Sequence, residues 1–201
     1  MAEERVKRKL SAILCADVVE YSRLMSEDEA ATLKLLNTCD AEIIEPTVKE
    51  YNGRIFKRLG DGFLVEFSSA VDSVECALAW QKHIEENKYP LHFRIGINLG
   101  DVIEQDDDMY GDGVNIAARI EKLAAPGGIC ISRSIFDQIL KKVNLGFEYL
   151  GEQQVKNISK PIGVYKLLTK PEDAGKVIGE DKPQVGNKFS SRQRIFAIAA
   201  S

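Results

Sequence analysis

The stretch from Asp108 to Arg119 carries polar side chains whose types and spacing suit recognition of a phosphorylated ligand. From Val114 onward the apolar residues recur with a helical period, so we expect a helix with Asp112 as its N-cap. Asn115 and Arg119 are four residues apart and share one face of that helix. An amide orients a ligand through hydrogen bonds in both directions, whereas a guanidinium neutralises a phosphate. Taken alone, this pattern also fits a surface helix with solvated polar groups.

Two aspartates, Asp17 and Asp61, are candidates for a metal site. Asp17 follows an apolar run over residues 12–16 that predicts a buried strand, and Asp61 lies in a Gly-Asp-Gly turn between two predicted strands. If these strands are neighbours in a sheet, both carboxylates project from one edge and repel each other unless a cation lies between them. Mg²⁺ binds one or two carboxylates together with substrate phosphates, and two such ions can activate an attacking oxygen and stabilise the leaving one. Each aspartate alone is more typical of ordinary turn chemistry.

The secondary-structure elements predicted around these side chains follow the order β-α-β-β-α-β. Periodicity predicts a strand up to Asp17, a helix from Ser26 to Lys49 that begins with a capping box, a hairpin over 53–67, a helix over 69–87, a strand pair over 91–98 and 101–104, the helix that begins at Asp112, a strand over 129–131, a helix from Ser132 to Leu140, and strands over 153–158 and 163–168. This order is the ferredoxin-like arrangement, an α+β fold with an antiparallel sheet and helices on one face.

The chain of 201 residues is long enough for one domain with a sizeable core. Its formal net charge of −4 argues against general affinity for nucleic acids or anionic membranes, so a phosphate site must depend on local cations. No targeting signal is recognisable, and we expect a cytoplasmic domain. The cysteines form no CxxC pair and are interpreted as buried thiols in a reducing compartment; they are Cys15, Cys39, Cys76 and Cys130.

Composition divides the chain near residue 169. Residues 1–169 contain the predicted elements, and 170–201 are expected to be a linker or tail, because residues 170–190 are rich in Lys, Pro, Gly and Asp. Arg192 and Arg194 precede the apolar run IFAIAAS, which fits the first turns of a truncated transmembrane helix. A tail with a chance apolar end is the alternative. The domain itself is not expected to enter the membrane, although a longer natural chain would tether it there.

The segments ILCADVVEYSRLM, GRIFKRLGDGFLVEF and FRIGINLGDVI, together with the helix described above, resemble the catalytic domain of class III nucleotidyl cyclases. Asp108 lies seven residues before Asn115 and eleven before Arg119, as in that family. The resemblance covers residues 9–168 and is specific, because several separated motifs recur in the same order.

The resemblance implies a site for two Mg²⁺ or Mn²⁺ ions. Asp17 and Asp61 match the metal-binding positions, and the main-chain carbonyl of Val18 is a further implied ligand. Ser22 and the free amides of the segment after Asp17 suit phosphate oxygens. Glu20 departs from the pattern, since many relatives have Gly there, and this leaves the detailed phosphate contacts open.

Lys57 and Asp108 match the residues that read the base. A lysine can donate to adenine N1 and an aspartate can accept from the 6-amino group, whereas guanine presents the inverted pattern. In the family, Lys with Asp accompanies ATP, and Glu with a small polar residue accompanies GTP. The resemblance therefore implies ATP, although Lys57 alone would also fit a solvated strand residue.

The implied function is that of an adenylyl cyclase, which converts ATP to 3′,5′-cyclic AMP and pyrophosphate. Asn115 and Arg119 would be catalytic, the latter by stabilising charge on the α-phosphate. Lys156 would contact the terminal phosphates, with Lys160 as a rival. Alternatives are a guanylyl cyclase and a non-catalytic nucleotide-binding regulator; a diguanylate cyclase lacks support because its GG(D/E)EF signature is absent. The two histidines, His83 and His92, are interpreted as surface or core residues.

The expected active unit is a homodimer. Lys57 and Asp61 lie in one short hairpin, yet one should read the base and the other should bind metal, at opposite ends of the substrate. A two-fold pair of domains resolves this conflict, because each site then takes its metal carboxylates from one protomer and its other residues from the partner. The family resemblance implies the same arrangement.

Overall fold

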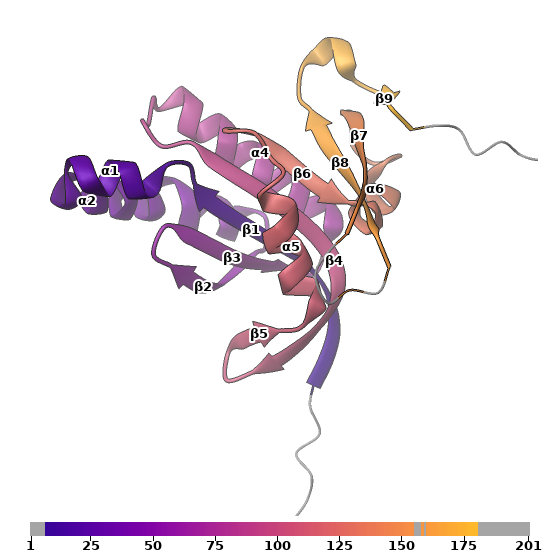
Figure 1. Ribbon diagram of the computed structural model, residues 1–201, viewed down its shortest axis with the longest axis horizontal. Helices are drawn as coiled ribbons and strands as arrows, with labels where there is room; N and C mark the ends of the chain where they lie inside the picture. Colours follow the sequence, from indigo (N-terminus) through magenta and orange to yellow (C-terminus); the bar gives the residue numbers. More distant parts are fainter. Residues whose placement is uncertain (1–6, 155–157, 159, 181–201) are drawn as a thin grey trace, which may run out of the picture.

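The apolar strand β1 (Lys7–Val18) lies inside a mixed sheet, with β3 (Gly62–Phe67) antiparallel on one side and β4 (Phe93–Gln105) antiparallel on the other. The computed structural model describes residues 7–154, 158 and 160–180. Across these ranges the strand order is β2-β3-β1-β4-β6-β8-β7-β9, and β5 pairs with β4 (Figure 1). The other strands are β2 (Arg54–Leu59), β5 (Asp108–Tyr110), β6 (Ile129–Ser132), β7 (Gly146–Gln153), β8 (Ile162–Leu168) and β9 (Val177–Ile178).

The predicted ferredoxin-like core is present in this sheet, and the α+β fold class is confirmed. Strands β1 to β4 lie in the order β2-β3-β1-β4, and every pairing among them is antiparallel. Beyond β4 the sheet continues through two parallel pairs, β4 with β6 and β7 with β9. The complete sheet is therefore mixed, whereas the sequence predicted an antiparallel one.

Helices lie on both faces of the sheet, which corrects the expectation of one covered face. Helices α4 (Ala70–Glu86) and α6 (Arg133–Ile139) pack on one face, and α5 (Asp112–Glu121) crosses the other (Figure 1). Alternate residues of β1 serve the two faces: Leu14 belongs to the main core, whereas Ile13 packs with Ala117 of α5. The helices before β2 are α1 (Tyr21–Glu27), α2 (Glu29–Cys39) and α3 (Glu45–Glu50), with a π-helix (Asp40–Ile44) between the last two.

The first helical region begins earlier than expected. The sequence predicted a start at Ser26 with a capping box, but α1 already begins at Tyr21. The Ser26 hydroxyl donates back to the carbonyl of Ser22 at 2.8 Å, so it does not cap a following helix. Asp28 is the N-cap of α2, because its carboxylate accepts from the backbone N–H of Ala31 at 2.9 Å.

The π-helix follows from Pro46. Proline has no backbone N–H, so the i to i−4 ladder cannot continue through this position. Directly before Pro46, the backbone N–H of Glu45 donates to the carbonyl of Asp40, five residues back, which is the π pattern. The helix expected to continue to Lys49 is therefore present, but in three segments.

Two other boundaries differ. The strand pair expected around residues 99–100 is one uninterrupted strand, β4, because both halves pair with β1. Gly111 rather than Asp112 is the N-cap of α5, and it has a φ of 116° that favours glycine. Of the strand expected over 153–158, residues 155–157 lie outside the described residues, and the strand before them, β7, ends at Gln153.

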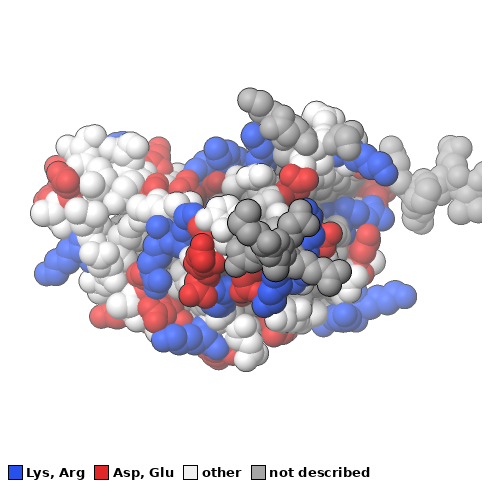
Figure 2. Space-filling model, turned by 90° about the horizontal axis from the view of Figure 1, so that it is seen from below, with Lys and Arg blue, Asp and Glu red and all other residues white. Residues whose placement is uncertain are grey.

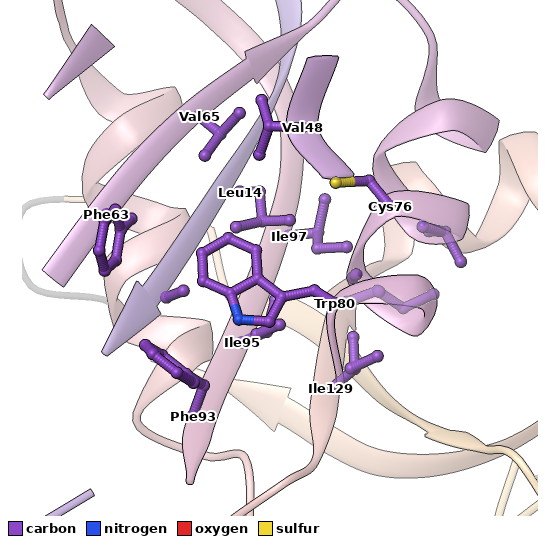
Figure 3. Packing of buried hydrophobic residues seen from close by; sticks show 14 of the residues in the cluster. Leu14, Val48, Phe63, Val65, Cys76, Trp80, Phe93, Ile95, Ile97 and Ile129 are labelled. Atoms are coloured by element: carbon purple, nitrogen blue, oxygen red, sulfur yellow. The ribbon is translucent and has the colours of Figure 1, made fainter. Parts of the chain in front are cut away.

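The main core lies between α4 and the sheet. Trp80 of α4 is fully buried, and its ring packs edge-on against Phe63 at 5.6 Å and Phe93 at 5.3 Å between ring centroids. Figure 3 shows Leu14 and Ile95 beside it, from the two central strands. Truncating a buried aromatic of this kind to Ala costs about 3–5 kcal/mol. This core fixes β1, β3 and β4 relative to one another.

A buried ion-pair network joins β1, β2 and β3 on the other face. Glu66 accepts from Ser11 Oγ at 2.9 Å, lies 2.6 Å from Lys9 Nζ, and accepts from Arg54 Nη2 at 3.0 Å. Burial opposes ionisation of Glu66, but these three partners outweigh the effect of burial and lower the pKa of Glu66.

On the face seen in Figure 2, acidic and basic side chains are interspersed and do not gather into a patch of one sign.

Residues 170–180, expected to belong to a linker, pack against the domain. A 3-10 turn (Pro171–Asp173) leads into β9, which pairs with β7. Glu180 accepts from the hydroxyl of Tyr165 at 2.7 Å and forms an ion pair with Arg133. The division of the chain at residue 169 stays a prediction, and the expected membrane flank, residues 192–201, lies outside the described residues.

A close approach of α5 to β4 yields a stability prediction. A Cβ atom at Gly96 would lie 2.2 Å from the backbone nitrogen of Glu121 and 2.5 Å from the carbonyl oxygen of Ala117. Gly96→Ala should therefore lower the free energy of unfolding by about 2–4 kcal/mol, measured by urea denaturation. Gly163→Ala is the control, because its new Cβ would have its nearest neighbour at 3.4 Å. Equal stability of the two variants would show that α5 does not depend on this contact.

Candidate functional site

The β1–β3 pairing brings the two candidate metal carboxylates together. Asp17 is in register with Gly62, and the backbone N–H of Val18 donates to the carbonyl of Asp61 at 3.3 Å. The pKa of Asp61 is raised, first by burial and then by the charge of Asp17. The juxtaposition expected from the sequence is therefore present, and the charge of Asp17 opposes ionisation of Asp61.

Arg94 completes this cluster and was not recognised from the sequence. It lies opposite Asp17 in the β1–β4 register, and its Nη2 donates to Asp17 Oδ2 at 2.8 Å. The signal that could have revealed it is the antiparallel register itself, since directly opposed residues of two strands share a face. Arg94 neutralises part of the charge that Asp17 and Asp61 place at this edge.

Glu121, at the end of α5, is a second carboxylate beside Arg94. It is 3% exposed, and its Oε1 lies 2.9 Å from Arg94 Nε, although the N–H is not aligned as a hydrogen bond. Burial raises the pKa of Glu121 to about 7; Arg94 opposes this shift, and the charge of Asp17 adds to it. Sequence reasoning missed this residue as well, because a glutamate near a helix end is usually solvated.

The two candidate base-reading residues also meet. Lys57 of β2 forms a hydrogen-bonded ion pair with Asp108 of β5. The other oxygen of Asp108 accepts from the backbone N–H of Met109 at 2.8 Å, and the ring of Tyr110 lies 5.7 Å from Lys57 Nζ. The bond from Lys57 lowers the pKa of Asp108, and the same bond raises the pKa of Lys57. One chain thus holds a cationic donor beside an anionic acceptor.

Asn115 and Arg119 lie one turn apart on α5, and both side chains are exposed. Within the described part of the chain, no hydrogen bond or ion pair joins either side chain to the carboxylate cluster or to the Lys57–Asp108 pair. Arg119 lines a cavity of about 210 Å³ together with Gln153 and Gln154. These two polar groups are therefore exposed and take no part in the carboxylate cluster or the Lys57–Asp108 pair of their own chain.

The remaining predicted site residues are placed as follows. Ser22 is exposed in the first turn of α1. Glu20, two residues before Ser22, has a left-handed φ of 57°, a conformation that glycine adopts without strain. Lys156 lies outside the described residues, and its rival Lys160 is exposed.

The two histidines differ in their distance from the cluster in the fold, because His83 lies on α4 whereas the main chain of His92 pairs with the end of β1. His83 Nδ1 is 3.2 Å from the hydroxyl of Thr47, and the carbonyl of His92 accepts from the backbone N–H of Val19 at 2.8 Å.

The carboxylate cluster fits a divalent cation in its donor chemistry. Over the ranges that the structure describes, no group of three or more His, Cys, Asp and Glu side chains is arranged to bind a metal. The adjacent carboxylates of Asp17 and Asp61 instead provide the number of carboxylate ligands that Mg²⁺ takes from a protein when substrate phosphates supply further ligands.

In the part of the chain that the structure describes, no helix is both long and apolar enough to cross a bilayer.

The sequence matches the family model of the adenylate and guanylate cyclase catalytic domain over residues 6–169. A Rhizobium meliloti (strain 1021) protein named "Putative adenylate cyclase 3" is 43% identical over an alignment of 198 residues, which covers 94% of this chain and 34% of that protein. An adenylate cyclase from Streptomyces coelicolor is 28% identical over 143 residues, 69% of this chain and 36% of that protein. The chain therefore spans about a third of the length of these relatives.

Solved structures show the same fold. An adenylate/guanylate cyclase/hydrolase from Silicibacter pomeroyi superposes with a TM-score of 0.76 at 38% identity, over 83% of this chain and 100% of that one. The adenylyl cyclase CyaB from P. aeruginosa superposes with a TM-score of 0.73 at 26% identity, over 85% and 100% of the two chains.

The buried acid yields a prediction about pH. The folded protein raises the pKa of Glu121 to about 7, above its ordinary value, so between these two values the folded state binds a proton that the unfolded chain has released. Stability from this group is therefore present at low pH and is lost as the pH rises through about 7. The melting temperature of Glu121→Gln is compared with that of the unaltered chain in metal-free buffer at pH 5 and at pH 8. The variant's melting temperature minus that of the unaltered chain should be several degrees larger at pH 8 than at pH 5. A melting-temperature difference that stays constant across this range would contradict the assignment.

Proposed function

This chain belongs to the family of adenylate and guanylate cyclase catalytic domains, and on that premise we propose that it is an adenylyl cyclase. It would convert ATP to 3′,5′-cyclic AMP and pyrophosphate. The ribose 3′-oxygen forms a bond to the α-phosphorus, the bond from that phosphorus to the oxygen bridging to the β-phosphate breaks, and the 3′-proton is released. The observation that carries the choice of ATP is the ion pair between Lys57 and Asp108.

The Lys57–Asp108 pair supports recognition of adenine. Its ammonium can donate to N1, and its carboxylate can accept from the 6-amino group. Guanine presents O6 and N1–H at these positions, so a donor would meet a donor and an acceptor would meet an acceptor. A site built of hydrogen-bonding groups rejects a mispaired ligand strongly, because its own polar groups are left unpaired.

The carboxylates of Asp17 and Asp61, with the main-chain carbonyl of Val18, would bind two Mg²⁺ or Mn²⁺ ions. When bound, such ions promote deprotonation of the 3′-hydroxyl and neutralise charge on the leaving pyrophosphate. Arg94, beside Asp17, adds a fixed cation at the same edge of the sheet. Catalysis then depends on positioning and electrostatics, as in phosphoryl transfer generally.

Asn115 and Arg119 would complete the site of a second copy. Both are exposed on α5, and among the described residues no hydrogen bond or ion pair joins either side chain to the carboxylate cluster of its own chain, which fits presentation to a partner. In a two-fold dimer Asp17 and Asp61 of one protomer face Asn115 and Arg119 of the other, together with the base-reading pair. Ser22 and Lys156 are the proposed contacts to the phosphates.

Base selectivity is tested by replacing Lys57 with Glu and Asp108 with Cys in one variant. We expect kcat/KM for ATP to fall by roughly two orders of magnitude or more, while GTP is accepted more readily. Lys166→Ala is the control, because it breaks an exposed ion pair with Glu148 on the far part of the sheet. Unchanged ATP kinetics in Lys57→Ala would exclude that side chain from the base pocket.

The shared site is tested by complementation. Asp61→Asn and Arg119→Ala should each be inactive alone, because each homodimer carries its lesion in both sites. In a heterodimer both lesions fall in one site and the other is intact, so an equal mixture should recover about a quarter of the unaltered activity. Subunit exchange is verified with two differently tagged chains. Two folded variants that exchange subunits and stay inactive would rule out the shared site.

A further inference from the structure

Glu121 is a buried charged residue to which the proposed reaction gives no role. Its backbone is seated directly on β4, because Gly96 lacks the Cβ that would lie 2.2 Å from the nitrogen of Glu121. The side chain is consequently enclosed between α5 and the sheet, at 3% exposure. A buried carboxylate is costly unless it is paired, so its partner is expected to matter to the site.

That partner is Arg94, which stands between two carboxylates. Its Nη2 donates to Asp17 Oδ2 at 2.8 Å, and its Nε lies 2.9 Å from Glu121 Oε1. Asp17 in turn adjoins Asp61 through the β1–β3 register. A continuous line of charges therefore runs from the end of α5 to the carboxylates proposed to bind metal.

We propose that Glu121 is a positioning residue, which holds the guanidinium of Arg94 and limits its neutralisation of Asp17 so that a divalent cation can bind there. This inference rests on the proposed function, because it takes Asp17 and Asp61 as metal ligands. Arg94 and a metal ion are both cations that compete for the charge of Asp17. The carboxylate of Glu121 attracts the guanidinium of Arg94 as well. Without this carboxylate, Arg94 pairs with Asp17 alone and competes more strongly with the metal ion for the charge of Asp17.

The same line of contacts connects two parts of the proposed reaction. Helix α5 presents Asn115 and Arg119, whereas β1 and the β2–β3 turn carry Asp17 and Asp61. Glu121 links that helix to those strand ends within one chain. In a dimer with shared sites these two sets belong to different active sites, so Glu121 connects the two sites through a single protomer.

A double-mutant cycle on metal binding tests the proposal. The unaltered chain, Glu121→Gln, Arg94→Gln and the double variant are titrated with Mn²⁺ in the absence of nucleotide, and free Mn²⁺ is measured by electron paramagnetic resonance. Glu121→Gln should weaken Mn²⁺ binding by roughly three- to tenfold when Arg94 is present. In the Arg94→Gln background the same change should have little effect, because the guanidinium that Glu121 restrains is gone.

Two further variants separate position from charge and from folding. Glu66→Gln neutralises another buried, ion-paired carboxylate on the same sheet and should leave Mn²⁺ binding unchanged. Glu121→Asp keeps the charge but shortens the reach to Arg94, and it should also weaken binding. Thermal unfolding verifies that each variant is folded.

The outcomes distinguish the inference from the function on which it rests. An equal loss of affinity in both Arg94 backgrounds, or full affinity in Glu121→Asp, would show that Glu121 acts through its charge alone and overturn the positioning role. Unweakened binding by Glu121→Gln would overturn it too. Mn²⁺ binding that Asp17→Asn and Asp61→Asn leave intact would instead overturn the proposed metal site, and the inference with it.

Discussion

The antiparallel register of β1 and β3 forces two carboxylates, Asp17 and Asp61, to the same edge of the sheet. Neighbouring like charges repel each other, and the charge of Asp17 contributes to the raised pKa of Asp61, so a cation nearby stabilises this edge. In the structure Arg94 is that cation, placed by the second antiparallel register, between β1 and β4. We interpret this edge as a site where the carboxylates bind divalent metal ions, which in turn bind a polyphosphate.

The placement of α5 depends on the same strands. Glycine at position 96 lets the helix lie directly on β4, and this close approach buries Glu121 beside Arg94. The opposite side of the helix then displays Asn115 and Arg119 outward. One packing contact therefore sets both the electrostatics of the carboxylate edge and the direction in which the helix presents its polar side chains.

Local signals predicted much of the fold. The β2–β3 hairpin, the helix capped by Ser69, whose hydroxyl accepts from Asp72 N at 3.2 Å, and the helix capped by Ser132 are present where the sequence places them. Turn glycines and cap residues determine such elements over a few neighbours, so a sequence reading can find them. The meeting of Lys57 with Asp108 was accessible only through motif spacing.

Features that depend on long-range pairing were not predictable in the same way. Whether α5 covers the same face as α4 depends on which alternate residues of β1 it meets, and Ile13 is apolar on either reading. Arg94 and Glu121 become part of the site only through the β1–β4 register and the approach at Gly96. A local apolar pattern does not contain either piece of information.

If this site cyclises ATP as proposed, its products balance the ATP consumed, and their quantities can be measured. The purified unaltered chain is incubated with Mn²⁺ and either ATP or GTP, and nucleotides and phosphates are separated and quantified. We expect each ATP consumed to appear as one 3′,5′-cyclic AMP and one pyrophosphate, with GTP consumed far more slowly. Formation of ADP and inorganic phosphate, preferential formation of cyclic GMP, or binding of ATP without turnover would contradict the proposal.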